Sequence, residues 1–203
     1  VSNINTRASM CLMGLGQIMY GQIGKGILYL CIEILFIIFF TLFGFSWLVG
    51  LFTLGTVEAD PWTGTEGDNS VIFLLLGIFS VFIIVLFISL YISNIKDANE
   101  TNKNIIQGRK PSTFKEDLLD LLDKKFYKSV LFFPIIGTLI FSILPIVFMI
   151  LIAFTNYGYP ILPPALVDWV GLENFEKIFS IGDIGPTFFK ILGWNLIWAF
   201  STT

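Results

Sequence analysis

An uncharged apolar run over residues 129–154 is the feature that most limits how this chain can fold. As an α-helix rising about 1.5 Å per residue, the run would be roughly 39 Å long, enough to cross a hydrocarbon core of about 30 Å with some tilt. Lysines precede the run, and an uncharged segment rich in turn-forming residues follows it. The run therefore predicts a membrane-spanning helix.

The composition also indicates a membrane protein. Hydrophobic residues make up 55% of the chain and charged residues only 13%, far from the average of soluble proteins. Two more apolar runs, 27–52 and 71–95, are predicted to be spans. A run over residues 191–203 is expected to be the start of a fourth span, cut short, because a spanning helix needs about 20 residues. The predicted fold is an all-α membrane protein, a helical bundle with three complete transmembrane helices and the start of a fourth.

The positions of lysine and arginine predict the orientation. The segment 96–128 holds eight of the twelve basic residues, whereas the segment 53–70 has none and the segment 155–190 has two. Cytoplasmic loops carry the excess of basic residues in membrane proteins. We therefore expect the segment 96–128 and the N-terminus in the cytoplasm, and the other two segments outside.

Within the basic segment, residues 113–127 are predicted to form an amphipathic helix. Thr113 and Glu116 have the spacing of a capping box at its start. Its apolar positions recur every four residues: Phe114, Leu118, Leu122 and Phe126. The helix would dock a partner protein, lie on the inner leaflet, or present its alternating charges to solvent. These interpretations remain open at this point.

Residues 1–26 are predicted to be an interfacial segment. Apolar residues at helical spacing favour a short helix in the plane of the membrane interface, although each glycine opposes a helix by about 1 kcal/mol. The stretch Gly14-Leu-Gly-Gln indicates either a tightly packed turn or a flexible lead-in. No strand precedes it and no Gly-Lys-Ser/Thr follows, so it does not predict a nucleotide-binding loop.

Several residues inside the predicted spans could have special roles. Glu33 is the only charge of the first span; it would serve transport, or lie near enough to the end of the span to reach water or Lys25. Pro134 and Pro145 are predicted to kink the third span. In the second span, small residues would allow close approach of another helix: Gly77 and Ser80.

The sequence predicts no chemistry of its own. The chain has no histidine, and it shows no metal-ligand spacing, no nucleophile–base pair and no phosphate-binding loop. We therefore expect no catalytic residue, no metal and no cofactor. Cys11 and Cys31 are predicted to be small core residues and not a disulfide.

Three motifs, taken in order, carry a resemblance to a known family. They are Phe-Thr-Asn-Tyr at 154–157, Trp-Val-Gly-Leu-Glu-Asn-Phe at 169–175 and Gly-Trp-Asn-Leu-Ile-Trp-Ala at 193–199, with a proline-rich loop after the first. This order resembles the first permease subunit of binding-protein-dependent ABC sugar importers, of the maltose/maltodextrin type found in Gram-positive bacteria. The resemblance covers most of residues 10–203.

The resemblance implies a multi-pass subunit of a bacterial plasma membrane whose permease core starts near residue 191. It further implies a second permease subunit, an ATPase dimer that hydrolyses the ATP, and an extracellular sugar-binding protein. The loop that docks the ATPase, and the substrate-lining residues, are expected downstream of Thr203, so the substrate-binding residues are unknown. Another sugar, glycerol phosphate, or a non-transport membrane scaffold remain alternatives.

Overall fold

The computed structural model describes residues 4–123, 126–163, 165–180 and 184–202. Within these ranges the chain is helical and forms no strand, and only isolated bridges occur in its connecting segments. Contacts group the chain into two units, Val1–Phe52 with Leu75–Pro145 and Thr53–Leu74 with Ile146–Thr203. The predicted all-α class is confirmed.

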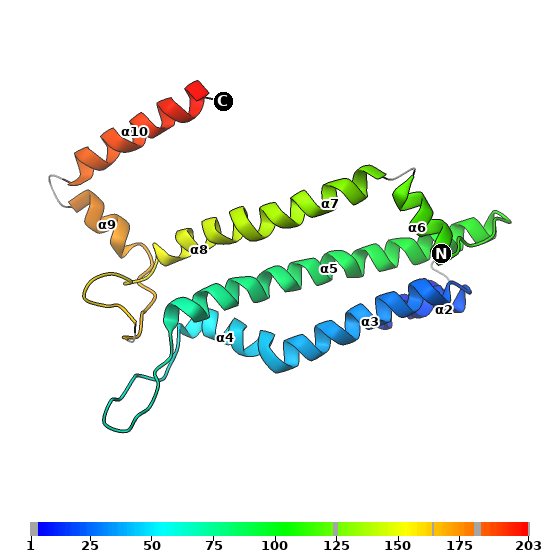
Figure 1. Ribbon diagram of the computed structural model, residues 1–203, viewed down its shortest axis with the longest axis horizontal. Coiled ribbons are helices and arrows are strands. Elements are labelled where there is room, and N and C mark those ends of the chain that lie inside the picture. The colour runs from blue at the N-terminus through cyan, green and yellow to red at the C-terminus, as the bar shows by residue number, and fades with distance from the viewer. Residues whose placement is uncertain (1–3, 124–125, 164, 181–183, 203) are drawn as a thin grey trace. The chain divides into compact units, whose positions relative to one another are not determined.

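Three stretches of helix are long and apolar enough to cross a membrane (Figure 1). The first consists of α3 (Ile23–Phe39), the π-helical turn η1 (Phe40–Gly44) and α4 (Phe45–Thr53); the second is α5 (Ser70–Ile106); the third contains most of α7 (Phe126–Thr138), η2 (Leu139–Ile143) and α8 (Leu144–Ile152). A helix satisfies its backbone polar groups internally, as a segment in hydrocarbon must. The prediction of three long apolar helices, each able to span a membrane, is confirmed.

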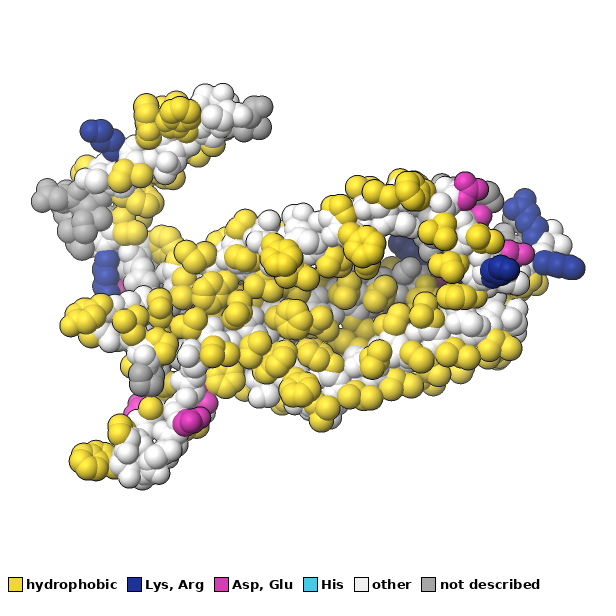
Figure 2. Space-filling view, viewed as in Figure 1, with side chains coloured by type: hydrophobic (Ala, Val, Ile, Leu, Met, Phe, Trp, Pro, Cys, Tyr) yellow, Lys and Arg dark blue, Asp and Glu magenta, His cyan; other side chains and the backbone are white. Residues whose placement is uncertain are grey.

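Most side chains of these helices are not buried within the chain. In the most apolar stretch of the first helix, only 6% of the residues are buried. The corresponding shares are 22% in the second helix and 0% in the third. Figure 2 shows hydrophobic side chains over most of the visible surface of the long helices. Such a surface is stable only when lipid or other protein covers it.

In the first unit, α5 packs along the helix formed by α3, η1 and α4. The rings of Phe36 and Phe87 stack with centroids 3.8 Å apart. A Cβ added to Gly77 would lie 2.4 Å from the Cβ of Leu51, and the Ser80 hydroxyl donates a hydrogen bond of 2.9 Å to the Gly44 carbonyl. The predicted close approach at Gly77 and Ser80 is therefore confirmed.

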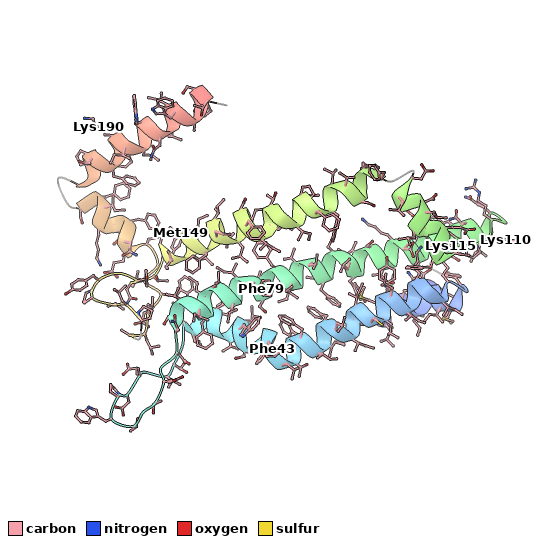
Figure 3. All side chains as sticks on the ribbon, viewed as in Figure 1. Phe43, Phe79, Lys110, Lys115, Met149 and Lys190 are labelled. Atoms are coloured by element: carbon pink, nitrogen blue, oxygen red, sulfur yellow. The ribbon has the colours of Figure 1, made fainter. Side chains whose placement is uncertain are left out.

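Aromatic rings continue this contact. Trp47 lies between Phe43 and Phe79, with ring centroids 5.7 Å and 6.3 Å away, and Figure 3 labels both phenylalanines. Aromatic pairs at such separations add favourable edge and offset contacts to the burial of their surface.

The prolines of the third span are accommodated in different ways. Pro134 lies inside α7, which continues past it, whereas Pro145 is the second residue of α8, one residue past the π-helical turn η2. Proline cannot donate a backbone hydrogen bond and crowds the preceding turn, and a local π turn is one way in which a helix adjusts to this. At Pro145, the irregularity predicted from the sequence takes the form of this π turn.

The second long helix extends past its apolar run. The sequence places residue 96 in a loop, yet α5 continues to Ile106. The reason is a row of small and polar residues that is buried against other parts of the first unit: Asn94, Ala98, Thr101 and Asn102. The helix therefore ends eleven residues after the apolar run 71–95 does.

The predicted amphipathic helix is present but shorter. Thr113 and Glu116 form the predicted capping box, and α6 (Phe114–Leu122) ends before Asp123, whose backbone is not helical. Phe126 belongs to the next helix, α7, and not to α6. Lys124 and Lys125 of the basic segment lie outside the described residues.

The prediction that Cys11 and Cys31 are core residues is wrong. Both thiols are free and exposed within the chain. Cys31 lies on α3, about 140° around the helix from Phe36, whose ring stacks on Phe87 of α5.

In the second unit, the loop 54–69 is ordered by two aspartates. Asp68 accepts hydrogen bonds from the amides of Thr56 and Val57, at 2.7 Å and 3.0 Å. Asp60 accepts from the Trp62 amide and the Thr63 hydroxyl, and these bonds lower the pKa of its carboxyl group. The loop thus has a defined conformation at its tip.

Candidate functional site

Polar and charged side chains of the first unit gather where its helices meet at one end. They come from α1 (Ile4–Cys11), α2 (Leu15–Met19), α3, α5 and α6. We call this set the polar cluster: Ser9, Gln17, Lys25, Glu33, Asn94, Asp97 and Asp117.

A tight turn at Gly14 brings α1 and α2 into the cluster. Gly14 has a φ of +83°, and a Cβ at this position would lie only 2.0 Å from the carbonyl oxygen of Gly26. Its amide donates a hydrogen bond of 3.1 Å to the side chain of Asn94. The predicted tightly packed turn is confirmed, the flexible lead-in is wrong, and two short helices replace the single one that was expected.

The face of α1 and α2 that is buried is the polar one. Ser9, Gln17 and Asn94 have no exposed surface. Gln17 donates to the Asn94 carbonyl at 3.0 Å and accepts from the Ser9 hydroxyl at 3.0 Å, while the Asn94 side chain donates to the Ser9 carbonyl at 3.1 Å. Burial of polar groups is tolerated because these bonds replace those to water.

Consequently, the apolar residues that predicted an interfacial helix point outward. Leu12 is 45% exposed and Met19 53% exposed. Sequence reasoning found this apolar stripe but not the polar face beside it. A signal for the polar face was present for two of its residues, since Gln17 follows a glycine and Asn94 lies within a long apolar run.

Lys25 is the charged centre of the polar cluster. Its ammonium lies 2.7 Å from Asp97 Oδ1 and 2.6 Å from Asp117 Oδ2. The three side chains are only 15%, 24% and 29% exposed, so solvent screens these ion pairs less than it screens pairs on an open surface. One ammonium therefore connects α3, α5 and α6.

Glu33 does not pair with Lys25. Its Oε2 accepts a hydrogen bond of 2.8 Å from the backbone amide of Met13, a residue with no exposed surface. The amide lies in the turn between α1 and α2, where no helix supplies an acceptor. The contact observed for Glu33 is thus a structural one.

The polar cluster offers ion pairs and hydrogen bonds but no reactive pair. Among the described residues, no group of three or more His, Cys, Asp or Glu side chains is placed to hold a metal ion. What this arrangement can do is fix four helices to α5 near the end of its apolar run.

A second site follows the third span and explains the motif at 169–175. The last carbonyls of a helix lack intrahelical donors. Here the Asn174 side chain donates to the carbonyls of Ala153 and Thr155, at 2.9 Å and 2.7 Å. The amides of Val170 and Gly171 both donate to the carbonyl of the intervening residue, Phe154.

The remaining motif positions support this cap. Gly171 has a φ of +60°, a left-handed conformation that favours glycine. Phe175, at the start of α9 (Glu173–Ser180), packs on Phe154 with ring centroids 5.3 Å apart. The sequence identified these residues only through their resemblance to a family, and their capping role required the folded structure.

α10 (Ile184–Thr202) contains the predicted start of a fourth span at residue 191. It contacts α9 through the rings of Phe179 and Phe189, whose centroids are 5.7 Å apart. Residues 181–183, between the two helices, lie outside the described part of the chain.

The three apolar helices and the polar cluster at the end of two of them define the chain as a multi-pass membrane protein. Its curated relatives are permeases of sugar transport systems. The chain is 34% identical over 94% of its length to the maltodextrin transport system permease protein MdxF of Bacillus subtilis, and 33% identical over 94% to MalC of Streptococcus pneumoniae. It is 34% identical over 94% to the galactooligosaccharides transport system permease protein GanP of Bacillus subtilis.

These relatives are longer proteins. The chain spans 42% of the length of the maltodextrin permeases and 44% of the galactooligosaccharides permease. No family model matches the chain, and no solved structure matches it. Over nearly all of its length, the chain is homologous to sugar transport permeases, which confirms the resemblance inferred from its motifs.

Proposed function

We propose that this chain is part of the membrane-spanning permease subunit of an ATP-driven oligosaccharide importer of the maltose/maltodextrin type. The observation that carries the proposal is the 33–34% identity to such permeases over 94% of the chain. Three helices able to span a membrane support it, since a translocation pathway is built between such helices.

The proposed partners follow from the kind of transport system. They are a second permease subunit, an ATPase dimer and an extracellular sugar-binding protein, all in or at the bacterial plasma membrane. The permease itself is not proposed to be an enzyme, since ATP hydrolysis belongs to the ATPase. Purification from detergent-solubilised membranes should recover an ATPase and a second permease; recovery of neither would favour the scaffold alternative.

The cargo is tested by uptake. A strain that lacks the gene should lose uptake of labelled maltotriose, and the gene on a plasmid should restore it. A labelled galactooligosaccharide is the second candidate because of the identity to GanP, and glycerol phosphate completes the panel. Unchanged uptake of all three compounds in the deletion strain would contradict the proposal.

We also propose that the N-terminus and the segment 96–128 are cytoplasmic. Gln107 and Trp62 are exposed and lie in segments that should face opposite sides of the membrane. In a background with Cys11→Ser and Cys31→Ser, a membrane-impermeant maleimide applied to intact cells should label Trp62→Cys and not Gln107→Cys. The reverse pattern would invert the orientation.

A further inference from the structure

The ion pairs of the polar cluster fix the level of α6 along the spans. Lys25 precedes the apolar run 27–52 by two residues, and Asp97 follows the run 71–95 by two residues. Their contact at 2.7 Å therefore marks the level at which both spans leave the hydrocarbon. Asp117 of α6 binds the same ammonium at 2.6 Å, which holds α6 at this boundary.

The side chains of α6 divide into distinct faces. At about 100° per residue, its exposed apolar residues fall within one arc of roughly 140° that also includes Lys115. They are Phe114, Leu118, Leu119 and Leu122, with 43%, 48%, 54% and 59% of their surface exposed. Asp117 lies outside this arc and points to Lys25. The apolar arc is thus partly exposed within the chain, although Phe114 also lies against Gly24 of α3.

Basic side chains lie within this arc and just before the helix. Arg109 and Lys110 are exposed just before α6, and Lys115 is exposed within it. Figure 2 shows lysine and arginine side chains gathered at this end of the first unit, and Figure 3 labels Lys110 and Lys115 there. Clusters of basic residues at a membrane surface attract anionic lipid headgroups.

We propose that α6 is an interfacial helix that binds anionic phospholipid. Its apolar arc enters the boundary between headgroups and acyl chains, while Arg109, Lys110 and Lys115 contact lipid phosphates. The ion pair of Asp117 with Lys25 holds the helix at this depth. The proposal depends neither on the transported sugar nor on which leaflet faces the cytoplasm.

The position of the helix can be tested with nitroxide labels. Leu118→Cys places a label in the apolar arc, and Asp123→Cys, one residue past the end of α6, is the matched control. Both are made with Cys11→Ser and Cys31→Ser, in the protein purified with its co-purifying subunits and reconstituted into phosphatidylglycerol bilayers. The label at 118 should relax more with lipid-soluble oxygen than with a water-soluble nickel complex, and the label at 123 should show the opposite.

Two results would overturn the placement of α6. A label at 118 that is accessible mainly to the nickel complex would show that the arc faces water. A label at 118 that neither reagent reaches would show that protein covers the arc, as a docking helix for a partner subunit requires.

The lipid charge is tested separately, with phosphatidylcholine in place of phosphatidylglycerol. In the parent chain, the ratio of oxygen to nickel accessibility at 118 should be at least about twofold higher in the anionic bilayer. The Lys110→Gln/Lys115→Gln variant should lose this difference, whereas the Lys177→Gln/Lys190→Gln variant should keep it. Equal ratios in the two lipids for the parent chain would refute specific binding of anionic lipid.

Discussion

The ammonium of Lys25 lies 2.7 Å from a carboxylate oxygen of Asp97, although 72 positions separate the two residues in the chain. One residue stands just before the first apolar run and the other just after the second. Opposite charges thus meet where the apolar runs of two antiparallel helices begin and end, and Asp117 adds a third helix to the same contact.

Substitution of Lys25 by methionine should destabilise the first unit. It leaves Asp97 and Asp117 close together without a counter-charge in a partly buried site. We expect a loss of about 1–3 kcal/mol, between the values for exposed and for fully buried ion pairs. The apparent melting temperature in detergent should fall by roughly 2–4 °C for each kcal/mol in a protein of this size.

Two further variants separate the charge effect from a general loss of packing. Lys25→Arg keeps the charge and should lower the melting temperature less than Lys25→Met. The Lys25→Met/Asp117→Asn double variant should be more stable than Lys25→Met alone, because one uncompensated carboxylate is removed. If the double variant were the less stable of the two, the carboxylate repulsion assumed here would be disproved.

Removal of the Asn94 side chain should be costly. In Asn94→Ala, the amide of Gly14 and the carbonyl of Ser9 lose their buried partners. Each such buried group left unsatisfied costs about 1–3 kcal/mol. The exposed Glu100, on the same helix, provides a matched control: Glu100→Ala should leave the melting temperature nearly unchanged. If both variants changed the melting temperature by similar amounts, the buried hydrogen bonds of Asn94 would not be important for stability.

The apolar parts of this fold were accessible from the sequence. Length and lack of charge are sufficient to identify the three spans, because the bilayer core imposes both. Local spacing was sufficient to predict the capping box of Thr113 and Glu116, because it depends on neighbouring residues of one helix. Residue size was sufficient to predict the close approach at Gly77.

The polar contacts were not accessible in this way. Lys25 and Glu33 are near one another in sequence, yet each pairs with a residue from another helix or turn. The charged part of α5 has the composition of a loop and is helical only because its small and polar face is buried. Partners far apart along the chain are selected by tertiary packing, which a pattern within one segment does not encode.

The turn between α1 and α2 should accept no side chain at Gly14. In Gly14→Ala, the new Cβ would clash with the carbonyl of Gly26, in addition to the strain of a positive φ. Gly21 is the matched control, since its φ is +84° but no atom lies within 4 Å of an added Cβ. Gly21→Ala should cost about 1 kcal/mol from strain alone.

The comparison is made by thermal unfolding of the two variants. Gly14→Ala should lower the melting temperature by clearly more than Gly21→Ala. If both variants lowered the melting temperature equally, the backbone would shift easily and the close contact with Gly26 would be unimportant for stability.

The cap of α8 should depend on Asn174. In Asn174→Ala, the carbonyls of Ala153 and Thr155 lose their side-chain donor, at a cost of about 1–2 kcal/mol. Hydrogen exchange in residues 153–158 should become faster, while exchange in α5 should not change. Glu176→Ala, an exposed change on the same short helix α9, should leave both regions unaffected; faster exchange in that variant would show that α9 as a whole holds the cap.

The π turn η1 affects how the first membrane-crossing helix meets its surroundings. A π turn contains more residues than an α turn, so the helix after Gly44 is rotated relative to the pattern that α3 would continue. A single helical wheel drawn from Ile23 to Thr53 would therefore assign the wrong sides to the residues of α4. Scanning substitutions along this helix should be analysed with two separate periodic patterns, one on each side of η1.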